Sequence, residues 1–337
     1  MFDPGDPRHR AFALLTVMPL FFSSNLVIGR AAVESVEPWT LAFLRWLLAF
    51  AILLPFAYAG LLRHRDTLLR QWDLIGLMGL LGMWFCGAGV YFALKYTTAT
   101  NGTLIYTSSP VLIVLLEWAF RGRAVGLREG LGIALAILGV ITIVVEGSLQ
   151  TLLSLSLNGG DLIFAIAALS WAVYSVLLKR QSLAPVPTLS LFAALALAGA
   201  VTLFPFTVVE IAETGRFPVT GSAWLSILGV ALVSSVLAFS CFQYGIKVVG
   251  PATTGLFMYL LPPYGVLMAV VFLGETLALH HLAGFVLIMS GLILATAPRA
   301  ILERLRPTRL LSRLERRSGR AGYAGSRSEN GRPESRP

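Results

Sequence analysis

Two stretches of the chain decide its fold: ALKYTTATNGTLIYTSSP at 93–110 and GIKVVGPATTGLFMYLLPP at 245–263. A constant shift of 152 residues aligns them without a gap. The same shift pairs Trp72 with Trp224, Lys95 with Lys247, Pro110 with Pro262, Gly122 with Gly274, Gly132 with Gly284 and Gly139 with Gly291; nearer the start a shift of 149–150 pairs Phe22 with Trp171 and Pro55 with Pro205. Glycines alone could coincide by chance in an apolar chain. Shared Trp, Lys and Pro at one offset favour a duplicated unit, as is common in transporters.

The composition around these stretches is that of a protein whose solvent is lipid. Of the 337 residues, 56% are hydrophobic and 13% are charged, against about 25% charged residues in soluble proteins. A bilayer core of about 30 Å requires roughly 20 apolar residues per helix. The chain has ten runs of about that length, at 12–30, 39–61, 74–95, 98–119, 126–146, 161–178, 187–209, 223–246, 251–274 and 279–297. We therefore predict an all-α polytopic membrane protein with ten transmembrane helices.

The distribution of Lys and Arg supports ten spans, because cytoplasmic loops are enriched in both residues. With the N-terminus inside, most of the 26 basic residues fall on the cytoplasmic side. The exceptions are Arg30, Lys95 and Arg216 on the opposite side and Arg45 within a span. Each half then holds five spans, an odd number, so equivalent helices run in opposite directions. The sequence predicts two inverted five-helix repeats, with both termini in the cytoplasm.

The domain boundaries follow from the repeat. We expect a cytoplasmic N-terminus at 1–11, a first repeat at 12–147 and a second repeat at 160–297. The first run is interpreted as a helix rather than a secretory signal peptide, because the repeat requires it as the partner of the sixth. Residues 298–337 carry eleven arginines and predict a disordered, basic cytoplasmic tail that contacts anionic lipid. Nucleic acid is not expected as a partner of this tail, since a bilayer surface is at hand.

Polar and aromatic side chains inside the spans indicate where a binding cavity would lie. A polar group in a membrane span costs free energy unless it pairs or lines a wet cavity, and helical spacing places several of these side chains on shared faces. The predicted cavity residues are Asn25, Arg45, Tyr91, Asn101, Tyr106, Trp171, Tyr174, Gln243 and Tyr259. For the aromatic residues, plain packing or an interfacial belt is the alternative. For Arg45 we favour a structural role, with binding of a substrate carboxylate as the alternative.

Three prolines are predicted hinges. Pro110, Pro262 and Pro263 each remove a backbone hydrogen bond from a helix. Equivalent kinks in inverted repeats would let one half close while the other opens, which is alternating access. Kinks that serve packing alone remain the alternative.

The spans show no cluster of metal ligands, no nucleophile with a histidine partner and no phosphate-binding loop, so we expect no cofactor, no metal and no enzyme activity. None of the 17 acidic residues falls in the middle third of a span. A proton relay normally requires a buried carboxylate or histidine, so tight proton coupling is not expected. The remaining alternative is a channel-like or structural membrane subunit without a transport cycle.

The order of these features resembles the drug/metabolite transporter superfamily, and within it the EamA family, over about residues 12–297. The matching features are Ser23, Ser24 and Asn25, Arg45, Pro110, and Pro262 followed by Leu273, Gly274 and Glu275. The fourth helix departs from the family by ending in Arg121, Gly122 and Arg123, where an acidic residue is common. The resemblance implies a small-molecule substrate, such as an amino acid, metabolite or drug, moved mostly outward across the inner membrane through a central cavity. The oligomeric state stays open.

Overall fold

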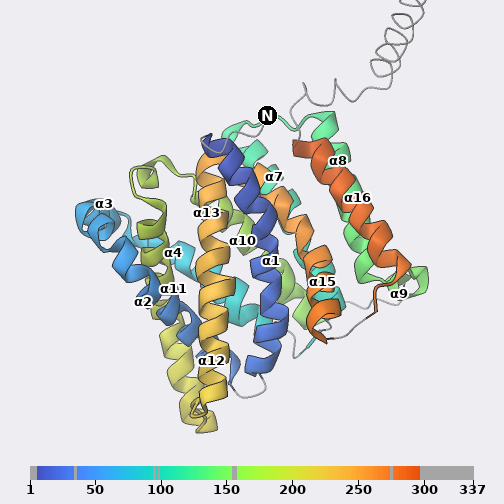
Figure 1. The fold of residues 1–337 in the computed structure, drawn as a ribbon. Coiled ribbons are helices and arrows are strands. Elements are labelled where there is room, and N and C mark those ends of the chain that lie inside the picture. The colour runs from blue at the N-terminus through green and yellow to red at the C-terminus, as the bar shows by residue number, and fades with distance from the viewer. Residues whose placement is uncertain are drawn as a thin grey trace, which may run out of the picture. The chain divides into compact units, whose positions relative to one another are not determined.

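The computed structural model describes residues 6–33, 36–93, 96–97, 99–153, 158–273 and 276–296, and these residues form helices and turns (Figure 1). Residues 1–295 form one compact unit. The predicted basic tail at 298–337 lies outside the described residues, as do Lys95, Gly274 and Glu275.

The ten predicted spans are confirmed as helices. Within the described residues, nine helical stretches are long and apolar enough to cross a membrane, and the 27-residue α1 adds the tenth long helix. The spans are α1 (Pro7–Val33); α2 (Pro38–Arg63); α4 (Trp72–Gly79), η1 (Leu80–Gly89) and α5 (Val90–Ala93); α6 (Ala99–Tyr106) and α7 (Ser109–Arg121); α8 (Leu127–Val144); α10 (Gly159–Leu177); α11 (Thr188–Thr214); α12 (Gly221–Gly229), η3 (Val230–Leu237) and α13 (Ala238–Val249); α14 (Pro251–Leu256), η4 (Phe257–Leu260) and α15 (Leu261–Leu273); and α16 (Leu279–Thr296). Short helices α3 (Arg65–Arg70), α9 (Leu149–Leu153) and η2 (Gln181–Leu183) lie between spans.

The helices pack with the symmetry that two inverted repeats require. The second span of each repeat packs along its counterpart (α2 on α11), and the fourth does the same (α7 on α14). The first span of one repeat crosses the third and fourth spans of the other: α1 contacts α13 and α15, and α10 contacts η1 and α7. Every such contact therefore has an equivalent related by exchange of the repeats. The fold is two inverted five-helix repeats.

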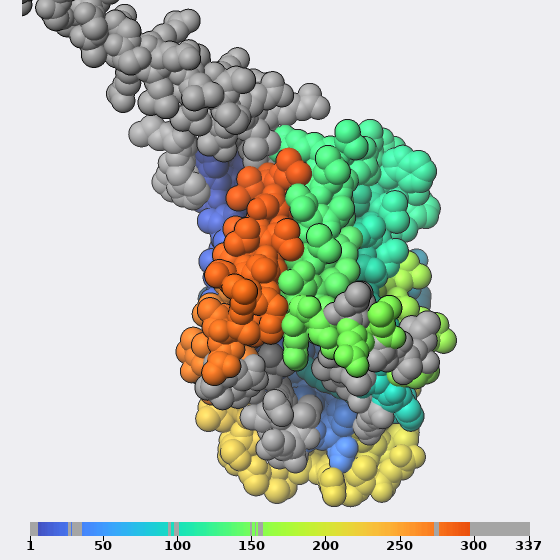
Figure 2. Space-filling model, turned by 90° about the vertical axis from the view of Figure 1, so that its right-hand side faces the viewer, coloured from blue at the N-terminus to red at the C-terminus, as the bar shows by residue number. Residues whose placement is uncertain are grey.

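The fifth span of each repeat, α8 and α16, meet through the four aligned glycines, and they lie side by side in Figure 2. A methyl group added at Gly132 would lie 2.6 Å from the carbonyl oxygen of Gly291, and one added at Gly139 would lie 2.6 Å from that of Gly284. The two contacts, Gly132 with Gly291 and Gly139 with Gly284, are equivalent. Position 132 of the first repeat aligns with 284 of the second, and 139 aligns with 291, so exchange of the repeats converts one contact into the other. Small residues thus permit the close backbone approach that membrane helices use to associate.

Both repeats are irregular at the same places. The third span contains a π-helical segment in each repeat, η1 and η3. The fourth span is broken in each: a turn at Thr107–Ser108 separates α6 from α7, and the tight turn η4 separates α14 from α15. Pro110 and Pro262 follow as second residues of α7 and α15. A proline near the start of a helix has no intrahelical bond to lose, so these prolines begin new segments instead of bending continuous helices.

A buried carboxylate on α11 holds the start of α2. Glu210 Oε1 accepts a hydrogen bond from the backbone N–H of Trp39 (3.1 Å), and its Oε2 accepts from the backbone N–H (2.7 Å) and the hydroxyl (2.9 Å) of Thr40. The first N–H groups of a helix have no intrahelical partner, and negative charge is favourable there. Glu210 therefore joins the two second spans at this end.

We expect Glu210→Ala to lower the free energy of unfolding by about 1.5–3 kcal/mol, because it leaves donors at a buried helix start without a charged acceptor. Thermal unfolding in detergent micelles measures the change. Glu213→Ala, three residues away on the exposed side of the same helix, is the matched control. Equal unfolding temperatures for the two variants would contradict the capping role.

Candidate functional site

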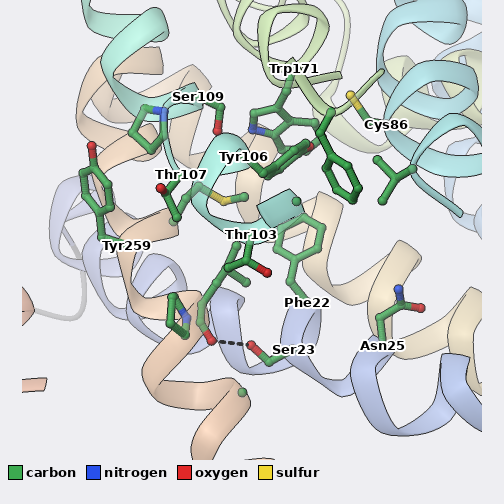
Figure 3. A pocket seen from close by; sticks show the side chains of 18 of the residues that line it. Phe22, Ser23, Asn25, Cys86, Thr103, Tyr106, Thr107, Ser109, Trp171 and Tyr259 are labelled. Atoms are coloured by element: carbon green, nitrogen blue, oxygen red, sulfur yellow. Dashed lines mark hydrogen bonds between the residues drawn. The ribbon is translucent and has the colours of Figure 1, made fainter. Parts of the chain in front are cut away.

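A cavity of about 610 Å³ lies between the two repeats. This volume falls within the range of about 300–1,000 Å³ that is typical of small-molecule pockets. The cavity is lined from the first repeat by α1, α2, η1, α5, α6, α7 and α8, and from the second by α10, α13, η4 and α15. Figure 3 shows Phe22, Tyr106 and Trp171 pointing into a shared space, with Asn25 and Tyr259 on opposite sides of it.

Seven of the predicted residues line this cavity and five do not. The lining residues are Asn25, Arg45, Tyr106, Pro110, Trp171, Tyr259 and Pro262; the others are Tyr91, Asn101, Tyr174, Gln243 and Pro263. Whether any of them binds a substrate or moves as a hinge stays a prediction. Their places in the structure, however, separate into distinct groups.

Asn101 belongs to a junction between helices. Its Nδ2 donates to Asp161 Oδ2 (3.4 Å), while Asp161 also accepts from the Thr97 hydroxyl (2.5 Å) and from the backbone N–H of Asn158 (2.8 Å). Asn158 in turn caps α10 through the backbone N–H groups of Gly160 and Asp161. This network fixes the start of α10 against α6, away from the cavity.

The other predicted residues include two equivalent amide–phenol pairs. Asn25 Nδ2 donates to Tyr91 Oη (3.0 Å) in the first repeat, and Gln243 Nε2 donates to Tyr174 Oη (3.1 Å) in the second. The shifts of 149 and 152 residues align Asn25 with Tyr174 and Tyr91 with Gln243, so the amide and the phenol have exchanged helices. Asn25 lines the cavity, whereas the Tyr174 side chain is fully buried. The amide–phenol hydrogen bond thus borders the cavity in the first repeat, whereas the equivalent bond is buried in the second.

Arg45 lies beside the open pair. Its side chain is 7% exposed, and its Nη1 donates to Tyr91 Oη (3.4 Å). Its Nε donates to the hydroxyl of Ser235 and its Nη2 to the backbone carbonyl of Ser234 (3.2 Å), both in the π-helical segment η3. The guanidinium therefore joins the two repeats by neutral partners and also lines the cavity.

The far end of the bundle, where α7, α10 and α13 finish, is held by basic side chains. Lys179 Nζ donates to the carbonyl of Lys247 (2.7 Å), and Arg121 Nη2 donates to the carbonyl of Val176 (3.0 Å). Arg121 also pairs with the buried Glu117 at 3.0 Å. Burial is the main cause that lowers the pKa of Lys179 below its ordinary value, and repulsion from Arg121 lowers it further. Attraction to Glu117 opposes both effects and is smaller. Cations at helix C-termini are favourable, so these contacts hold the ends of α7, α10 and α13 together.

Sequence reasoning missed several lining residues, among them Phe22, Trp46, Cys86 and Phe239. Three of them form an aromatic cluster: Phe239 contacts Phe22 (5.2 Å between ring centroids) and Trp46 (4.9 Å). Apolar residues within an apolar helix carry no periodic signal. Cys86 lies four residues from Gly82 and four from Val90, which also line the cavity. The α-helical spacing is present there, but glycine and valine carry no polar signal that marks the face.

Cys86 gives a chemical probe of the cavity. It lines the cavity, while Cys241, the second cysteine, is buried elsewhere. We expect a small maleimide to modify Cys86 first and to block uptake of solute, because the adduct occupies the cavity. Mass spectrometry locates the adduct, and Cys86→Ser is expected to abolish the block while Cys241→Ser retains it. Equal modification and block in both variants would contradict this assignment.

Ten long helices in two inverted repeats around a central cavity define a polytopic membrane protein of the inverted-repeat class. The EamA-like transporter family model matches residues 10–145 and 158–297, one match for each repeat. The chain belongs to this family.

Curated relatives and a solved structure agree with that assignment. The uncharacterized transporter YyaM of Bacillus subtilis is 26% identical over 285 residues, covering 85% of this chain and 93% of YyaM. An uncharacterized transporter of Archaeoglobus fulgidus is 28% identical, covering 84% of this chain and 96% of its own length. The uncharacterized inner membrane transporter YedA of Escherichia coli is 26% identical, covering 85% and 90%. A crystal structure at 23% identity superposes with a TM-score of 0.70 over 89% of this chain and 99% of its own, which shows the shared fold.

Proposed function

We propose that the protein is an inner-membrane transporter that exports small metabolites, such as amino acids or amphipathic compounds, by alternating access. The cavity supports this proposal: both repeats line it, and the equivalent amide–phenol pairs are open in the first repeat and buried in the second. If the second repeat took the conformation of the first, and the first that of the second, the cavity would open at the other side of the membrane. The multi-pass fold and the relative named an inner membrane transporter support the location.

The lining residues indicate which end is open. They include Asn25 late in α1, Arg45 early in α2, Val144 at the end of α8 and Ala269 late in α15. With both termini in the cytoplasm, as the distribution of Lys and Arg predicts, that end faces outward. The structure then corresponds to an outward-open state whose cytoplasmic end is closed by Lys179, Arg121 and their partners.

The first test is thermal stabilisation of the purified protein across a panel of amino acids, nucleosides and amphipathic drugs. A ligand that binds only the folded state raises its stability, so a saturable shift names the class of substrate. Uptake of that solute into proteoliposomes is expected to saturate. Flux that rises without saturation, or no flux for the entire panel, would favour a channel-like or structural subunit.

Transport is expected to persist when a protonophore collapses the proton gradient. The described lining residues include no Asp, Glu or His that could carry a proton through the cavity. Counterflow of labelled solute in proteoliposomes, measured with and without the protonophore, tests this. A fixed ratio of protons to solute would contradict it.

A further inference from the structure

We propose that the cavity selects organic anions: its substrate is an amphipathic carboxylate without a positively charged group. This inference rests on the proposed function and names the class of substrate. Three independent properties of the lining carry it: its charge, its unpaired hydrogen-bond donors and its apolar remainder.

The charge of the lining is positive. Arg45 carries the single full charge among the described residues that line the cavity, and Asp and Glu are absent from that set. Arg45 takes part in none of the ion pairs that the described residues form; its hydrogen-bond partners are the neutral groups of Tyr91, Ser234 and Ser235. A buried charge is costly unless it is paired. Three of the five guanidinium N–H groups are used in these bonds, so an incoming carboxylate finds both a counter-charge and further donors.

Three lining side chains carry a buried donor that has no hydrogen-bond partner in the described part of the chain. The indole N–H groups of Trp46 and Trp171 and the hydroxyl of Tyr259 have no hydrogen-bond partner among the described residues. These side chains are 1%, 2% and 1% exposed and all three line the cavity. An indole N–H can only donate, and a buried donor without a partner is unfavourable. The three polar atoms are buried from the cavity in this structure, so a carboxylate, whose oxygens only accept, would bond them once these side chains turn toward it.

A cation finds a poorer match. Ser23 and Thr107 line the cavity and donate their hydroxyl protons to the carbonyls of Leu261 (3.0 Å) and Leu104 (2.6 Å), so their oxygens can still only accept. These acceptors are neutral oxygens. An ammonium group would therefore meet Arg45 with no carboxylate to offset the repulsion. This argument ranks anions first, zwitterions next and cations last.

The remaining lining selects an apolar body. Phe22, Trp171 and Phe239 form edge-on ring contacts at 5.2–6.1 Å, and Tyr106 and Met258 add apolar surface. Aromatic walls bind flat apolar groups through burial and ring contacts. A carboxylate on an aromatic or aliphatic body of modest size therefore fits the whole lining.

The class of substrate has a consequence for energy coupling. An anion that leaves a cytoplasm at negative potential moves down the electrical gradient, which is worth about 50-fold in concentration per 100 mV and unit charge. Uniport of the anion is then driven without a proton relay. An imposed potassium diffusion potential is expected to accelerate its export.

A matched series of indoles tests the proposal. Indole-3-propionate, tryptophan and tryptamine share one ring system and carry a negative charge, both charges and a positive charge. Titration calorimetry with the purified full chain is expected to give the lowest Kd for indole-3-propionate, about tenfold or more below that of tryptamine. Equal or tighter binding of tryptophan or tryptamine, or no saturable binding of indole-3-propionate, overturns the proposal.

Arg45→Gln tests the residue. The wild-type protein is expected to prefer indole-3-propionate over the neutral indole-3-propionamide by about tenfold or more, and the variant is expected to bind both about equally. Because the readout is a ratio, a purely structural role would lower both affinities and leave the preference intact, which would overturn the assignment. Arg45→Lys keeps the charge and is expected to keep the preference.

Should Arg45→Gln not fold, Trp171→Phe must weaken binding of the carboxylate more than binding of the amide for the proposal to stand. Saturable flux of some other solute would leave the transport function intact even if the anion proposal fails.

Discussion

Filling the cavity from Gly265 is expected to stop transport without unfolding the protein. Gly265 lines the cavity from α15, and no atom of the described residues lies within 4 Å of a Cβ built there. The side chain of Gly265→Phe therefore has room to leave the backbone and then occupies space that a substrate needs. We expect the initial rate of uptake into proteoliposomes to fall at least about tenfold, which corresponds to a loss of about 1.4 kcal/mol of binding free energy. The unfolding temperature is expected to stay like that of the wild type.

Gly130→Phe is the matched control. Gly130 lies on α8, is exposed, and also has open space around its added Cβ, but it does not line the cavity. Both changes replace a helical glycine, so their effects on helix propensity are similar. Normal transport by Gly265→Phe, or equal loss in both variants, would contradict the assignment of the cavity as the substrate site.

Separating α8 from α16 is expected to produce the largest loss of stability. The Cβ added in Gly139→Leu would lie 2.6 Å from the carbonyl oxygen of Gly284 and 2.8 Å from the backbone N of Ile288. Backbone atoms cannot rotate away, so the two helices must move apart. We expect the free energy of unfolding to fall by about 3 kcal/mol, the upper part of the range for overpacked interiors.

Gly291→Leu is expected to cost as much as Gly139→Leu, because the exchange of repeats makes the two positions equivalent and a Cβ added at Gly291 likewise meets backbone atoms, the carbonyl oxygen of Gly132 and the N of Ala136. Gly130→Leu on the same helix is the control and is expected to cost little. Thermal unfolding in a fixed detergent measures all three. A large difference between Gly139→Leu and Gly291→Leu would count against the symmetry of this contact.

The sequence predicted the architecture closely and the cavity only in part. The number of spans and their inverted arrangement follow from hydrophobicity and spacing. Both can be predicted from the sequence because the thickness of the bilayer fixes the length of an apolar run, and the side of the membrane fixes the charge of a loop. The aligned glycines at 132, 139, 284 and 291 meet as the duplication requires. The breaks before Pro110 and Pro262 were likewise signalled by proline chemistry.

The cavity depends on features that local patterns do not contain. The third span lines the cavity with Gly82, Cys86 and Val90, and nothing in the apolar run LLGMWFCGAG at 80–89 predicts which of its residues face the cavity or that it forms the π-helical segment η1. Gln243 was grouped with the lining residues as a polar residue within a span, and Tyr174 because helical spacing places it on one face with Trp171. Both side chains are buried and lie outside the cavity lining, although the repeat equates them with Tyr91 and Asn25. Sequence symmetry identifies such pairs, and only the structure shows which of them is open.

Single cysteines at Ser23 and Ala172 test alternating access most directly. The shift of 149 residues makes these positions equivalent; Ser23 lines the cavity and Ala172 is fully buried on α10. In a Cys86→Ser, Cys241→Ser background, a membrane-impermeant maleimide is applied from each side of oriented vesicles. The account predicts that Ser23→Cys reacts only from outside, that Ala172→Cys reacts only from the cytoplasm, and that substrate changes the two rates in opposite directions. Reaction of both cysteines from one side, or rates that rise together, would contradict it.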